Sequence, residues 1–99
     1  MNDNTGTAAD RIRQHLAALT PTLVELVDDS QRHAGHAGAA SGGGHYNLRI
    51  ASAQFDGLTA LARHRLVYAT LSPLMQREIH ALSIIALTPD EASTQLPTA

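Results

Sequence analysis

The sequence contains no cysteine, and this absence excludes three kinds of chemistry. The chain cannot form a disulfide, cannot use a thiolate as a nucleophile, and cannot give sulfur ligands to a metal. Any site for a metal that prefers sulfur would therefore have to take its thiolates from another molecule.

Basic blocks and long apolar runs are also missing. The net charge is −2 with neutral histidines, so the chain lacks the positive field that draws many proteins to nucleic acid. The opening residues, MNDNTGTAAD, have no positive or apolar segment of the kind found in secretion signals, and no apolar run is long enough to span a bilayer. We therefore expect a soluble, cytoplasmic protein without a membrane segment.

Histidine is what the chain has instead, with six residues in 99. The glycine-rich stretch DSQRHAGHAGAASGGGHY, residues 29–46, contains His33, His36 and His45. Such a composition predicts a loop. Histidines in a loop are usually exposed surface residues, and the alternative is that they bind a metal.

Hydrophobic periodicity predicts alternating helices and strands. The cleanest signal is the alternation of Tyr46, Leu48 and Ile50 with polar neighbours, which is typical of a half-buried strand. In chain order, we expect a helix over 7–19, strands over 23–27 and 46–51, helices over 59–71 and 72–79, a strand over 81–87 and a further helix start at 88–91.

This order predicts an α/β fold in a single domain, with a small three-stranded mixed sheet and helices packed on it. The first two strands should pair antiparallel, and the helical crossover permits a parallel third strand. The last strand is apolar on both faces, so we expect it inside the sheet. The domain should cover residues 8–92, with flexible tails over 1–7 and 93–99.

Several residues around the helix over 59–71 have predicted structural roles. Gly57 should form the turn before the helix. Leu61, His64, Tyr68 and Leu71 share helical spacing, so we expect them on the buried face, with His64 as a hydrogen-bonded core residue rather than a metal ligand.

A small basic patch is one feature that suits nucleic acid. Arg63 and Arg65 lie on that helix, Arg77 follows it, and Arg49 on the second strand adds to them. They could contact a phosphate backbone or an acidic partner, although a solvated helix face is the more ordinary interpretation.

No catalytic arrangement emerges from the sequence. There is no nucleophile motif and no glycine-rich phosphate loop after a strand, and Asp28 and Asp29 are neighbours that should point to opposite faces of a strand. We therefore expect a binding and assembly module and not an enzyme.

The residues also resemble a known family. The strings VELVDDSQRH, HY, FDG, RHRLVYATL, HALSI and TPDE are similar to the BolA family, and the resemblance covers residues 12–91. The resemblance implies a fold related to the class II KH module. It also implies an adaptor that pairs with a monothiol glutaredoxin, around a bridging [2Fe-2S] cluster, in iron–sulfur cluster assembly and trafficking or in iron regulation.

For this chain, the resemblance implies that His33 and His80 are cluster ligands, while the glutaredoxin and a glutathione give two sulfurs. Imidazoles replace two thiolates on one iron in Rieske centres, so the ligand set is chemically reasonable. His36 and His45 are the second-choice ligands.

Two alternatives remain open at this point. Some members of the family are described as transcriptional regulators, which suggests a DNA-binding protein that uses a helix-turn-helix-like pair over 57–79. A free-standing histidine metal-binding protein is the other. A homodimer and weak DNA binding are also possible on either interpretation.

Overall fold

The computed structural model describes residues 6–29 and 44–94, so His33 and His36 lie outside the described residues. Within these two ranges, no helix has the length and apolar character needed to cross a membrane. The main elements are α1 (Ala8–Leu16), β1 (Leu23–Asp28), β2 (Gly44–Ala51), α2 (Ala60–Thr70), β3 (Ile79–Leu87) and α3 (Pro89–Thr94).

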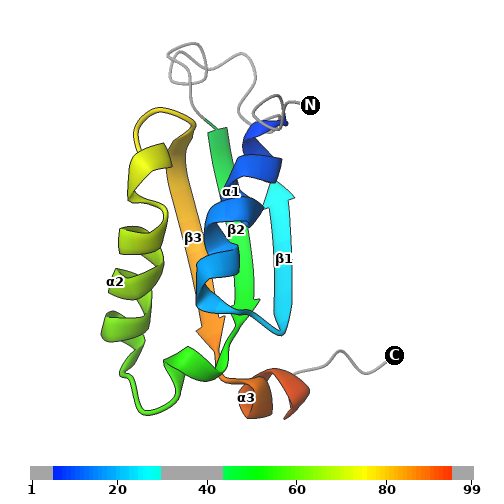
Figure 1. Ribbon diagram of the computed structural model, residues 1–99, viewed down its shortest axis with the longest axis vertical. Coiled ribbons are helices and arrows are strands. Elements are labelled where there is room, and N and C mark those ends of the chain that lie inside the picture. Colours follow the sequence, from blue (N-terminus) through cyan, green and yellow to red (C-terminus); the bar gives the residue numbers. More distant parts are fainter. Residues whose placement is uncertain (1–5, 30–43, 95–99) are drawn as a thin grey trace.

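The three strands form one mixed sheet in the order β1-β2-β3 (Figure 1). β1 pairs antiparallel with β2, and β3 pairs parallel with β2, which confirms the predicted pairing. The expected position of the last strand is wrong, because β3 lies at an edge and β2 is central. An apolar strand can be covered by helices as well as by neighbouring strands, so its composition does not fix its place in the sheet.

One face of the sheet carries the core. Figure 1 shows α1 and α2 on the same side of the strands. The predicted alternation is confirmed, because Tyr46, Leu48 and Ile50 are buried while Asn47 is exposed. The fully buried core residues contributed by the helices are Ile12 and Leu16 from α1 and Val67 from α2, with Leu71 at the end of α2.

The predicted buried face of α2 is partly wrong. Leu71 and Val67 are fully buried, but Leu61 is 60% exposed and Tyr68 is 40% exposed. His64 is only half-buried, and its ring makes no hydrogen bond within the described part of the chain. Because apolar residues occur on every side of α2, spacing alone could not select the face that packs on the sheet.

The predicted helix over 72–79 is reduced to a single 3-10 turn, Ser72–Leu74. Pro73 lies within this first turn, as the sequence predicts. The turn ends at Met75, which is already extended, and Gln76 follows with a φ of 69°, in the left-handed region, before β3 starts at Ile79. The helix-turn-helix-like pair proposed over 57–79 is therefore absent from the fold.

Gly57 has the turn role that the sequence suggests. Its φ is 80°, a conformation that residues with a side chain rarely adopt, and the space around it is open. The turn lets the chain leave the 3-10 helix Ala53–Phe55 and enter α2 at its N-cap, Thr59.

Candidate functional site

Two histidines meet where β2 and β3 begin. Parallel strands start at the same end of a sheet, so the second residue of β2, His45, lies near the second residue of β3, His80. A register irregularity between Gly44 and His45 offsets the two strands at this point. The ring centroids of His45 and His80 are 5.2 Å apart and the rings are stacked, with 29° between their planes.

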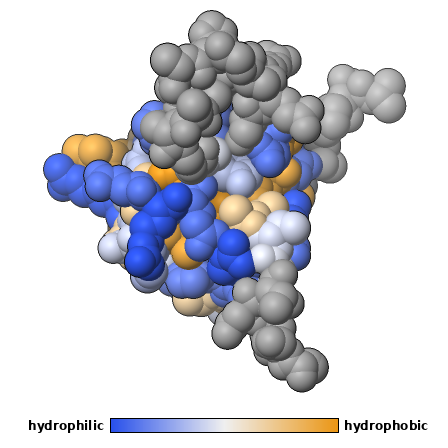
Figure 2. Space-filling model, turned by 90° about the horizontal axis from the view of Figure 1, so that it is seen from above, coloured by the Kyte–Doolittle hydropathy of each residue, from blue (hydrophilic) through white to orange (hydrophobic). Residues whose placement is uncertain are grey.

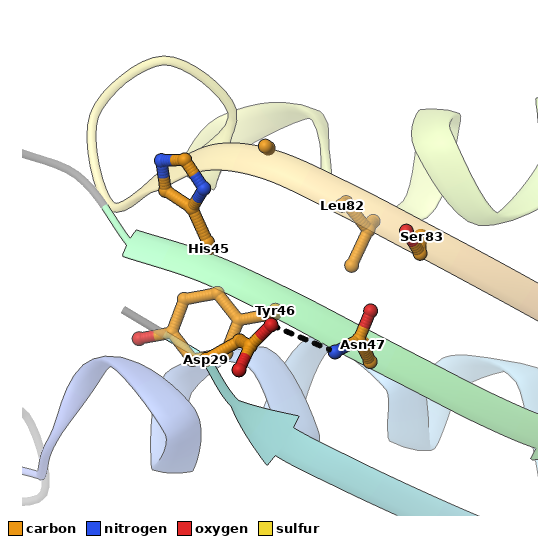
Figure 3. A pocket seen from close by; sticks show the side chains of 7 residues that line it. Asp29, His45, Tyr46, Asn47, Leu82 and Ser83 are labelled. Atoms are coloured by element: carbon orange, nitrogen blue, oxygen red, sulfur yellow. Dashed lines mark hydrogen bonds between the residues drawn. The ribbon is translucent and has the colours of Figure 1, made fainter. Parts of the chain in front are cut away.

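The pair is accessible from outside. His80 is exposed and His45 is half-buried. Figure 3 shows the His45 ring projecting from β2 over a shallow hollow. The hollow has a volume of about 190 Å³, and its lining residues are Asp29, His45, Tyr46, Asn47, Ala81, Leu82 and Ser83.

Polar side chains form part of the lining of this hollow. The side-chain amide of Asn47 donates a hydrogen bond to the Asp29 carboxylate across β2 and the end of β1, at 3.5 Å (Figure 3). Figure 2 looks onto this end of the molecule and shows hydrophobic residues lying between hydrophilic ones. A partner that reaches the histidines would therefore meet a mixed surface.

The separation of the two rings matches that of two ligands of one metal ion, but their stacked orientation does not, so the rings must turn before both point a nitrogen at the same ion. Two imidazoles bound to one ion through nitrogens at about 2 Å have ring centres about 5 Å apart, close to the observed separation. Among the residues that the structure describes, no group of three or more His, Asp or Glu side chains could hold a metal. The described chain therefore offers at most two ligands here, and the others must come from elsewhere.

On the core side of the same end, Tyr46 lies in a charged setting. Burial raises the pKa of its phenol, the negative charges of Asp28 and Glu78 raise it further, and Arg11 opposes them. The neutral phenol is therefore the stable form, and Tyr46 acts as packing beneath the histidine pair.

Arg63 has a structural role and does not form the predicted surface patch. Its guanidinium donates to the Leu58 carbonyl at 3.0 Å and the Ala86 carbonyl at 3.1 Å. It also forms an ion pair with Glu91 at 2.6 Å, and only 14% of its side chain is exposed. The sequence could not show this, because Glu91 is 28 residues away.

Glu91 in turn caps α3. Its carboxylate accepts from the Thr88 backbone at 2.9 Å, and the Thr88 hydroxyl accepts from the Glu91 backbone at 3.2 Å. This reciprocal arrangement is a capping box. The hydrogen bond from Arg63, followed by that from Thr88, lowers the pKa of the Glu91 carboxyl below its ordinary value.

Arg65 and Arg77 are both exposed, as a partner-contacting role would require. In the described part of the chain, neither side chain makes a hydrogen bond or an ion pair. With Arg63 and Arg49 engaged in ion pairs, only these two remain of the predicted basic patch.

The structure brings together His45 and His80 but leaves His64 apart on α2. Sequence reasoning did not single out Asn47 and Ser83, which line the hollow beside His45. Both residues occupy outward-facing positions of an alternating strand. Such a position indicates a shared site only once the register of β2 and β3 is known.

Comparison with known proteins identifies the family. The family model described as BolA-like protein matches residues 16–91. The chain is 42% identical over 92 residues to SufE-like protein 1, chloroplastic/mitochondrial, of Arabidopsis thaliana, covering 87% of this chain and 25% of that protein. It is 38% identical over 91 residues to Protein BOLA1, chloroplastic, of the same plant, covering 88% of this chain and 57% of that protein.

A bacterial relative is also similar. The chain is 38% identical over 80 residues to the DNA-binding transcriptional regulator BolA of Escherichia coli, covering 80% of this chain and 73% of that protein. The chain thus spans about a quarter and about half of the two plant relatives and most of the bacterial one.

Solved structures agree with these matches. The BolA domain of SufE1 from Arabidopsis thaliana superposes with a TM-score of 0.74 at 43% identity, covering 87% of this chain and 96% of that domain. The solution structure of BolA1 from Mus musculus gives a TM-score of 0.72 at 38% identity, covering 93% of this chain and 75% of that one. With its sequence and its fold both matched over most of its length, this chain belongs to the BolA family.

Proposed function

We propose that this chain is an adaptor that pairs with a monothiol glutaredoxin and shares a [2Fe-2S] cluster with it in iron–sulfur cluster assembly, trafficking or iron regulation. The observation that carries the proposal is the stacked, accessible pair of His45 and His80 at one end of the sheet. The proposal also draws on the family to which the chain belongs.

The donor set favours a shared site over a site within this chain alone. A [2Fe-2S] cluster takes four ligands, and imidazoles can replace the two thiolates on one iron. The chain has no cysteine, and its described residues bring only two histidines together. The glutaredoxin and a glutathione would supply the two sulfurs. The bound cluster would carry iron and sulfide that an acceptor protein can receive.

His80 is the first ligand in this proposal because the start of a paired strand holds its backbone. The second ligand comes from one of three histidines. The family resemblance favours His33, and His36 lies three residues beyond it; the structure favours His45, which already stacks on His80. A free-standing metal-binding protein is less favoured, because the described residues supply no third ligand.

Single variants mixed with a monothiol glutaredoxin, glutathione and an iron–sulfur source test this assignment through visible circular dichroism. His80→Ala should abolish or alter the cluster spectrum. Among His33→Ala, His36→Ala and His45→Ala, the variant with the largest spectral change identifies the second ligand. His64→Ala is the matched control, because His64 lies on α2 and takes no part in the His45–His80 ring contact. A wild-type spectrum from His80→Ala would refute the ligand role of that residue.

A DNA-binding regulator is the second candidate, because the similar Escherichia coli protein carries that name. The fold weakens this candidate: the expected second helix is a 3-10 turn, and Arg63 is held by Glu91. We expect weak binding that depends on salt and not on sequence. A specific footprint that Arg65→Ala and Arg77→Ala abolish would make DNA binding the primary function.

Location and oligomeric state remain proposals as well. The names of the two Arabidopsis relatives place those proteins in chloroplasts or mitochondria. For this chain we propose a location in the cytoplasm, which fractionation of the source cells tests.

We also propose that the chain forms a homodimer, which a heterodimer replaces when glutaredoxin is present. Light scattering of the protein with and without glutaredoxin tests this change of partner.

A further inference from the structure

Glu78 is the residue at which three parts of the fold meet, immediately before β3. Its carboxylate accepts from Arg11 Nε of α1 at 2.7 Å. Its backbone carbonyl accepts from the Gly44 amide at 3.0 Å, and its own amide donates to the Leu74 carbonyl at 2.9 Å. One residue thus connects α1, the start of β2 and the 3-10 turn after α2.

The backbone connects both histidines of the pair to Glu78. His80 follows Glu78 by two positions in the chain. His45 follows Gly44, whose amide the Glu78 carbonyl holds. The register irregularity of the two strands falls at this same step. A displacement of Glu78 would therefore move the two imidazoles relative to each other.

Backbone hydrogen bonds close the turn that contains Glu78, from the Gln76 amide to the Ile79 carbonyl at 2.8 Å and from the Glu78 amide to the Leu74 carbonyl at 2.9 Å. Gln76 has a positive φ, and the Gln76 and Arg77 side chains are exposed, so the Glu78 side chain links this turn to α1. Arg11 provides an anchor because it neighbours Ile12, a fully buried core residue of α1. The Arg11 and Glu78 side chains are 31% and 27% exposed, so water and salt screen their ion pair only in part.

We propose that Arg11 and Glu78 are positioning residues for the His45–His80 pair, and that their ion pair sets the separation of the two rings. The part of the inference that concerns ligand binding rests on the proposed function. The part that concerns the ring geometry is independent of it. Neither residue touches the metal; both act through the backbone that presents the histidines.

The test uses the full chain carrying His33→Ala and His36→Ala, so that added zinc reports on His45 and His80 without competition from His33 and His36. In this background, Arg11→Gln and Glu78→Gln are compared with the parent. The measurements are the nuclear Overhauser contacts between the two imidazole rings and the affinity for zinc. We expect both variants to lose the ring contacts and to bind zinc about tenfold more weakly, as is typical when a residue that orients a ligand is removed.

A second ion pair of the same sheet provides the matched control. Arg49 bonds Glu25 at 3.1 Å between β1 and β2, away from the turn that contains Glu78. Arg49→Gln should leave both measurements unchanged. The charge exchange Arg11→Glu with Glu78→Arg should restore the ring contacts, which a general loss of stability would not allow. If the neutral variants fail to fold, Arg11→Lys, which keeps the charge, should fold and retain the contacts.

The outcomes separate the two proposals. Unchanged ring contacts in folded Arg11→Gln and Glu78→Gln would overturn the positioning role, whatever the cluster does. Lost ring contacts in these variants would support it even if wild-type protein formed no cluster with glutaredoxin, a result that would refute only the proposed function.

Discussion

Replacement of Arg63 by alanine should destabilise the protein strongly, although the sequence places this arginine in an apparent basic surface patch. The change removes two charge-assisted hydrogen bonds to backbone carbonyls, those of Leu58 and Ala86, at 3.0 and 3.1 Å. It also removes the partner of Glu91 and uncovers the space filled by a side chain that is only 14% exposed.

The magnitude follows from these contacts. Hydrogen bonds from a charged group contribute about 1.5–3 kcal/mol each, but water can replace part of this at a site near the surface. We discount the ion pair with Glu91, because the side chain of that residue is 44% exposed. The expected loss is about 2 kcal/mol, which lowers the melting temperature of a domain of this size by about 8 to 16 °C.

Urea unfolding followed by circular dichroism measures this loss directly. Arg65→Ala is the matched control, because Arg65 is an exposed arginine of the same helix, and its change should stay within about 0.5 kcal/mol. A stability of Arg63→Ala within that same range would refute the structural role of Arg63. It would also return this residue to the group of candidates for binding nucleic acid or a partner.

Three further perturbations test the fold. Because Arg63 lowers the pKa of Glu91, the stabilisation that Glu91 provides is complete above its ordinary pKa of 4.5 and is lost as the pH falls through the folded-state value. Glu91→Gln should therefore reduce the loss of stability on acidification below about pH 5, and a pH profile identical to that of wild type would contradict this. Val67→Ala should cost about 2 kcal/mol and His64→Ala less than about 1 kcal/mol, as measured by urea unfolding, because Val67 is fully buried and His64 is half-buried. The reverse order would show that the wrong face of α2 had been assigned to the core. Gly57→Ala should cost about 1 kcal/mol in thermal melts because of its positive φ, and no loss would argue against that turn.

The parts of the fold that could be predicted are those in which local pattern and tertiary packing agree. The alternation of Tyr46, Leu48 and Ile50 identified β2 and its buried face. Because polar residues lie between them, only the face with these three side chains can be buried. The antiparallel and parallel pairings followed from connection length, since a helical crossover returns the chain to the same end of the sheet.

The errors have physical causes in particular residues. In α2, Leu66, Val67 and Tyr68 are consecutive, so the apolar pattern covers several faces, and tertiary contact alone selects Val67. The helix expected after Pro73 ends at the extended Met75 and the left-handed Gln76, and neither conformation has a sequence signal, because neither residue is glycine or proline.

The sequence indicated that histidines form the candidate site, but it did not indicate that His45 and His80 are the two that meet. From composition alone the loop histidines were more simply exposed surface residues, and the resemblance to the BolA family suggested imidazole ligands, with His80 among them. Its neighbour His45 was only a second choice, because the contact between them depends on the parallel register and its irregularity at Gly44. The contribution of Glu78 depends on contacts with residues that are remote in sequence, so no local pattern could indicate it.

The most direct test of the central claim is the visible circular dichroism spectrum of the wild-type chain mixed with a monothiol glutaredoxin, glutathione, iron and sulfide, compared with glutaredoxin alone and with the His80→Ala mixture. We predict a cluster spectrum that differs from that of glutaredoxin alone and that requires both proteins in one complex on size exclusion. We also predict that His80→Ala returns the spectrum to that of glutaredoxin alone. A wild-type mixture whose spectrum equals that of glutaredoxin alone, with the two proteins eluting separately, would contradict the account.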